Sequence, residues 1–126
     1  LNDRPTFKDD VHTFSADGTF TQDFQGETWV EAWQDGAGDG SRAPVAPHDG
    51  SNAATWSTDE AAGTLTLTGV GAHLGVPKAV NGAELGADSE VPASRTYIVS
   101  SASATEITLD IDSGGAKWRA VLTKVN

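Results

Sequence analysis

The chain contains neither cysteine nor methionine. Without thiols it can form no disulfide, no cysteine-ligated zinc site, no iron–sulfur cluster and no thiol nucleophile. Long apolar runs are also missing, because none approaches the roughly 20 residues that a membrane-spanning helix requires. We therefore expect no membrane insertion. The first residue is Leu1, and we expect it to follow a processing site or a tag.

Basic residues are scarce, since 8 Lys and Arg oppose 18 Asp and Glu for a formal net charge of −10. This charge repels phosphate, which argues against nucleic acids and anionic membranes as partners. The acidic residues are scattered, as on a solubilising surface. The length of 126 residues predicts a single domain, residues 1–126, whose core needs no staple. Residues 1–10 lack a pattern and predict an irregular N-terminal segment.

Short runs of β-forming residues dominate the rest of the chain and predict an all-β fold. Asp17-Gly18 between the first two runs is a hairpin signal. Breaks at residues 35–53 and 71–92 predict long loops, and the apolar middle of the second predicts a flap or short helix over one end of the fold. The fold class is an up-and-down antiparallel barrel of about eight strands. The predicted strands are Val11–Ser15, Thr19–Gln25, Thr28–Gln34, Ala54–Ser57, Thr64–Val70, Ser94–Ser100, Glu106–Asp112 and Ala116–Lys124.

Strand alternation places Trp29, Glu31 and Trp33 on one face of the predicted third strand. A carboxylate is costly in a dry core, so this face lines a wet cavity or lies on the surface. In a cavity, the rings and the acid would contact an amphipathic ligand. On the surface, they would form a platform for stacking sugars. A third interpretation is that Arg95 or Arg119 pairs with Glu31, which would then be structural.

Five large rings are the main candidates for ligand contacts, although the same rings can simply fill a core. Small barrels hold side chains or one small ligand. His73, in the apolar break, is a candidate gate at the pocket mouth. The predicted ligand-binding residues are Trp29, Glu31, Trp33, Trp56, His73, Tyr97, Trp118 and Arg119.

Metal and catalytic signals are weak. Asp35 and Asp39 alternate with glycines, as in calcium loops, but the full ligand set of such a loop is absent. No two histidines have metal-ligand spacing. There is no nucleophile elbow and no facing pair of carboxylates. We therefore expect no enzyme activity and no cofactor.

Several segments resemble a known family. The stretches Val11–Phe20, APVAPHDGS at residues 43–51, Ala54–Leu67 and GVGAHLGVPKAVNG at residues 69–82 are similar to uncharacterised lipocalin-like (calycin-type) domains. Such domains occur in secreted proteins of marine bacteria and in marine metagenomes. The resemblance covers roughly residues 9–125, but the Gly-Thr-Trp-type first strand usual in the family is missing. It implies a lipocalin-like barrel and a secreted or cell-surface bacterial location, and it implies no catalytic residue.

Three functions follow as expectations. The first is non-enzymatic binding of a small amphipathic or apolar ligand inside the barrel, with residues 71–92 as a lid. The second is a glycan-binding accessory module that uses Trp29 and Trp33 on its surface. The third is a structural or adhesion scaffold without a small ligand.

Overall fold

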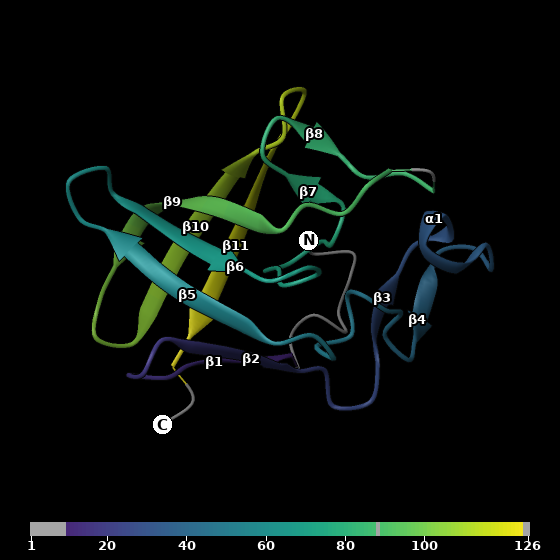
Figure 1. Cartoon of the computed structure of the whole chain (residues 1–126), viewed down its shortest axis with the longest axis horizontal. Coiled ribbons are helices and arrows are strands. Elements are labelled where there is room, and N and C mark those ends of the chain that lie inside the picture. The colour runs from purple at the N-terminus through teal and green to yellow at the C-terminus, as the bar shows by residue number, and fades with distance from the viewer. Residues whose placement is uncertain (1–9, 88, 125–126) are drawn as a thin grey trace.

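The computed structural model describes residues 10–87 and 89–124, which form an all-β fold with one short helix (Figure 1). A seven-stranded antiparallel sheet curls into a half-barrel, and two small sheets stand beside it. The all-β prediction is confirmed. The predicted irregular segment at residues 1–10 lies outside the described residues, except for Asp10. Within the described residues, no helix has the length and apolarity needed to cross a bilayer.

The large sheet follows the chain closely, because each strand pairs with the next one of the sheet in sequence. Its order is β1-β2-β5-β6-β9-β10-β11, and all six pairings are antiparallel. Among the described residues, no ladder joins β1 to β11. The strands are β1 (Val11–Phe14), β2 (Thr19–Asp23), β5 (Ala54–Asp59), β6 (Thr64–Thr68), β9 (Ser94–Ala102), β10 (Glu106–Asp112) and β11 (Lys117–Thr123).

The inner face of this sheet carries the core. Leu65 and Leu67 of β6 are buried while the threonines that alternate with them are more exposed, as the alternation predicts. Leu109 of β10 and Ala120 of β11 join the same cluster. Burying a side chain such as Leu67, which is 0% exposed, stabilises a fold by about 1.5–3 kcal/mol. This cluster therefore holds the half-barrel in its curl.

The predicted barrel strand Thr28–Gln34 is wrong. Without it, the large sheet has seven strands and stays open. Only β3 (Thr28–Val30) is extended, and it pairs with β4 (Gly40–Arg42) in a sheet of its own. The helix α1 (Ala32–Asp35) follows directly. Glu31 and Gln34 form a reciprocal capping box that starts the helix, and Gly36, in the left-handed conformation with φ 79°, ends it. β2 therefore pairs directly with β5, and seven strands remain instead of eight.

Residues 71–87 enter the half-barrel instead of covering it as a lid. The segment contains no helix. It contains a short hairpin whose two strands, β7 (Ala79–Val80) and β8 (Ala83–Glu84), have two residues each. Leu74 and Val76 are 3% and 1% exposed and belong to the core cluster. The Tyr97 hydroxyl accepts a hydrogen bond of 2.9 Å from the Leu74 backbone N–H. The segment thus fills much of the interior that the sequence assigned to a ligand.

A close backbone contact anchors this segment. Gly71 has φ 93°, and a Cβ there would lie 1.9 Å from the carbonyl oxygen of Pro47. Gly18, in the β1–β2 turn, has nearly the same φ of 92°, but nothing lies within 4 Å of its Cβ position. Substituting both glycines therefore distinguishes two effects. Both substitutions strain the backbone, but only the one at Gly71 adds a steric overlap.

Gly71→Ala should destabilise the protein more than Gly18→Ala. Both variants carry the penalty of about 1–2 kcal/mol for a left-handed residue with a side chain. Only Gly71→Ala adds the overlap with Pro47, which we expect to cost about 1–3 kcal/mol more. Urea unfolding followed by tryptophan fluorescence measures both free energies. Equal losses would contradict the contact between residues 71–87 and the loop that holds Pro47.

Candidate functional site

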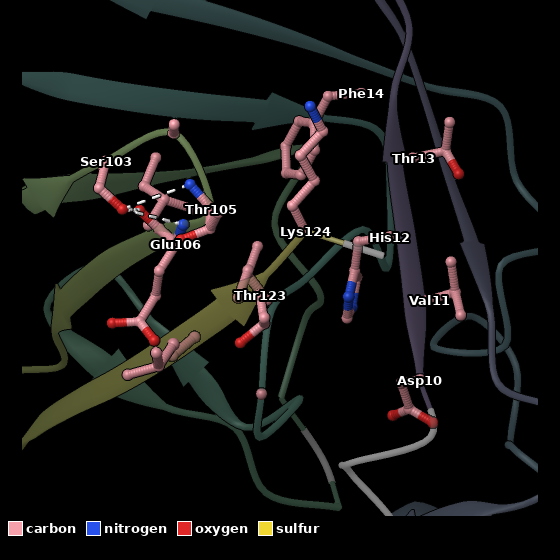
Figure 2. Close-up of a pocket in the computed structure, with 16 residues that line it drawn as sticks. Asp10, Val11, His12, Thr13, Phe14, Ser103, Thr105, Glu106, Thr123 and Lys124 are labelled. Atoms are coloured by element: carbon pink, nitrogen blue, oxygen red, sulfur yellow. Dashed lines mark hydrogen bonds between the residues drawn. The ribbon is translucent and has the colours of Figure 1, made fainter. Parts of the chain in front are cut away.

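The open side of the half-barrel forms a groove, which we call the seam groove. It lies between the edge strands β1 and β11 and has a volume of about 1160 Å³. Figure 2 shows β1 on one side of this gap and the end of β11 with the β9–β10 turn on the other. Its walls are formed by residues 10–14, Gly75, residues 103–107 and residues 120–124.

Apolar side chains form the floor of the seam groove. Phe14 packs against Phe20 with ring centroids 5.0 Å apart. Ile107 and Leu122 are half-buried and pack against the core cluster from β10 and β11. The floor therefore continues the core to the surface, as expected of a site that binds apolar groups.

The polar side chains of the groove show no arrangement for catalysis. His12 points from β1 toward β11 (Figure 2) and stacks on Phe20 with centroids 6.0 Å apart. Burial lowers its pKa to about 4, so the ring is neutral at pH 7. The Ser103 hydroxyl oxygen accepts backbone N–H bonds from Thr105 and Glu106. The Ser103 bonds stabilise the β9–β10 turn. Neither of them joins a nucleophile to a base.

The predicted set Trp29, Glu31 and Trp33 does not share a strand face. Trp29 lies on β3, Glu31 caps the helix and Trp33 lies within it. Glu31 is 6% exposed. Its carboxylate accepts a 3.3 Å bond from the Trp33 indole and lies 3.7 Å from the Lys78 ammonium. Lys78 is therefore an ionic partner of Glu31. Arg95 and Arg119 bind other groups, so their predicted pairing with Glu31 is wrong.

Trp56 and Trp118 contact different parts of the protein. The Trp56 indole donates a 2.8 Å bond to the Ser15 carbonyl and meets Phe14 edge-on. The Trp118 indole donates to Glu84 at 2.8 Å, and Lys78 lies 5.1 Å from its ring centroid. Arg119 points to solvent and binds Asp110. Of the predicted residues, none lines the seam groove; Trp56 is linked to it through Phe14.

His73 and Tyr97 belong to a buried polar cluster that the sequence did not reveal. Arg95, 1% exposed, donates to the carbonyls of Pro77 and Ala79 and to His48 Nε2, at 2.7, 3.1 and 3.0 Å. The His48 and His73 rings meet edge-on at 5.4 Å. Among the described residues, no carboxylate pairs with Arg95. The cluster is closed to solvent and ties residues 71–87 to β9.

Both histidines of this cluster are held neutral. Burial, and then the nearby Arg95 charge, lowers the pKa of His48 to about 4. Burial, and to a lesser degree Arg95 and His48, lowers the pKa of His73 well below its usual value. The His73 Nδ1 lies 2.8 Å from the Gly71 carbonyl, which assigns the proton of the neutral ring to Nδ1. Because the two rings are neutral, they add no positive charge beside the buried Arg95 guanidinium.

The calcium candidates in the glycine-rich loop have protein partners. Asp35 accepts two bonds from the Arg42 guanidinium, at 2.8 and 2.6 Å, and Arg42 holds its pKa down at about 2. Asp39 accepts the Ala32 backbone N–H at 2.9 Å. In the described part of the chain, no three His, Asp or Glu residues are grouped to hold a metal ion.

No protein-family model, curated protein or solved structure matches this chain. The seam groove is thus defined by its own geometry. The residues that line it are small, branched or polar, and they come from the two edge strands and one turn.

Stability should fall as the pH is lowered from about 6.5 to about 4. His12, His48 and His73 have lower pKa values in the folded chain than in the unfolded chain, so the unfolded chain binds more protons in this window. Each histidine adds up to about 1.4 kcal/mol of lost stability per pH unit. Asp35 and Asp110, with pKa values of about 2, act only at lower pH.

The measurement is urea unfolding at a series of pH values, with His48→Gln as the comparison. The Gln side chain can still accept a bond from Arg95 but does not titrate. We expect this variant to lose about one third of the slope between pH 6.5 and 4. A free energy of unfolding that stays constant between pH 7 and 5 in the unmodified protein would contradict the buried neutral histidines.

Proposed function

We propose that this chain is a non-enzymatic binding protein that takes a small amphipathic or apolar ligand in the seam groove. The single observation that carries the proposal is the groove itself, about 1160 Å³ of open space between β1 and β11. This volume is slightly above the usual range for ligand sites, about 300–1000 Å³. Its floor is apolar and its rim is polar, which suits a ligand with one face of each kind.

The proposal moves the ligand from the interior of the barrel to its opening. The interior is occupied by Leu74, Val76 and Tyr97, so a ligand there would have to displace core side chains. The seam groove needs no such displacement. In this view the sheet corresponds to a lipocalin-like barrel of about eight strands in which one strand is missing. The groove lies where that strand would be.

The location follows from the same proposal. A secreted or cell-surface bacterial protein, as the resemblance implies, would meet apolar ligands in water, where an open groove gives direct access. The net charge of −10 keeps such a surface soluble. The glycan-binding alternative needs Trp29 and Trp33 on one strand face, an arrangement that α1 removes.

A neutral dye tests the proposal, because an anionic dye would be repelled by the net charge. Nile red fluorescence should rise on binding to the groove. Leu122→Trp replaces an aliphatic side chain of the floor with a bulkier indole that fills part of the groove. It should weaken binding at least about tenfold, or 1.4 kcal/mol. Ile98→Trp is the control, since Ile98 lies on β9 outside the groove lining and is 50% exposed. It should change the affinity less than about twofold.

Thermal melting of both variants verifies that they stay folded. Equal affinities of the two variants for Nile red would place the dye elsewhere and would overturn the proposal. The same result would follow if the unmodified protein did not bind the dye.

A further inference from the structure

The edge strand β1 directs main-chain groups into the seam groove, where no described strand pairs with them. The Ser15 N–H donates to the Thr19 carbonyl at 2.9 Å, and β1 and β2 stay in register from there to Val11. In an antiparallel pair, hydrogen-bonded positions recur at every second residue. Thr13 and Val11 therefore bond to β2. The N–H and C=O groups of His12 and Phe14 point away from β2, toward the groove.

The edge strand β11 forms the opposite wall of the seam groove and also directs main-chain groups into it. The Ser113 N–H donates to the Ala116 carbonyl and the Lys124 N–H donates to the Thr105 carbonyl, at the two ends of the β10–β11 ladder. Both bonds give the same phase, in which Ala120 and Leu122 bond to β10. The N–H and C=O groups of Val121 and Thr123 consequently point toward the groove.

The directions of the two edges define what can fit between them. Six antiparallel pairings link β1 to β11, so the two edge strands run the same way around the half-barrel. One added strand can be antiparallel to both. An even total of eight strands then closes the ring with antiparallel neighbours throughout, and eight strands leave an interior that side chains can fill.

A strand in this position would alternate its side chains between floor and solvent. Inward side chains would meet Phe14, Ile107 and Leu122, so they should be apolar. Outward side chains would stand at the surface of a protein whose formal net charge is −10. Cationic outward residues are therefore favoured.

We infer that the ligand of the seam groove is an extended, cationic peptide segment with apolar residues at every second position. It pairs through its main chain with β1 and β11 at once. This inference rests on the proposed function and names its ligand class. A lipid would cover the apolar floor but leave both rows of main-chain groups without partners, whereas an added strand satisfies them.

The first test uses a labelled heptapeptide of the sequence acetyl-Lys-Val-Thr-Val-Lys-Val-Thr-amide and fluorescence anisotropy. We expect saturable binding. Two further versions carry N-methyl groups on the odd or on the even amides. Odd amides face one edge and even amides face the other, so each version should lose at least about tenfold in affinity. Full binding of either version would overturn pairing with both strands.

The second test removes one donor from the protein. Val121→Pro deletes an N–H that faces the groove and leaves the ladder to β10 intact, a place where edge strands accept proline. Val121→Thr keeps the donor and the branched side chain. We expect the proline variant to bind the peptide at least about tenfold more weakly and the threonine variant within about twofold. Equal peptide affinities would overturn the inference.

Failure of the inference differs from failure of the proposed function. If Nile red binds and Leu122→Trp blocks it while the heptapeptide does not bind, the groove is a small-molecule site and the inference falls alone. If neither binds, both fall. If the unmodified protein is a dimer in sedimentation and Val121→Pro makes it monomeric, the occupant is a second copy, which also overturns the inference.

Discussion

A curled sheet with an odd number of antiparallel strands cannot close with antiparallel neighbours, and this constraint governs the protein. Seven strands leave β1 and β11 as two edges that run in the same direction. Each edge carries main-chain groups that no other described strand uses. Open edges are normally shielded because they invite pairing. Here the two edges face one groove of about 1160 Å³ with an apolar floor, so the edges that leave the sheet open also form the walls of the proposed site.

The chain fills the interior of the half-barrel with its own residues. Residues 71–87 insert Leu74 and Val76 into the half-barrel, and Arg95 holds this segment through the carbonyls of Pro77 and Ala79. Two of the three guanidinium nitrogens donate to neutral acceptors, one of which is His48 Nε2, and this bond requires that His48 stay unprotonated. Packing and electrostatics thus act together in this core, and the proposed binding surface lies at its margin.

Much of the fold was predictable from the sequence. Seven of the eight predicted runs are strands of the sheet, and Glu106–Asp112 matches its bounds at both ends, because alternating apolar residues and glycine turns are local signals. The error at Thr28–Gln34 also had a local signal, since Glu31 and Gln34 have the spacing of a capping box. The candidate site was not predictable. Its shape depends on which strands pair across the barrel, and the acceptors of Arg95 come together only in the tertiary fold.

The central claim is that β1 and β11 are free edges facing each other, and amide hydrogen exchange tests it most directly. Backbone amides of the unmodified protein would be followed by NMR. The account predicts fast exchange at His12, Phe14, Val121 and Thr123, with slow exchange at the alternate positions Thr13, Ala120 and Leu122. Slow exchange at the first set, in the protein without any added ligand, would show that the seam is already closed and would contradict the account.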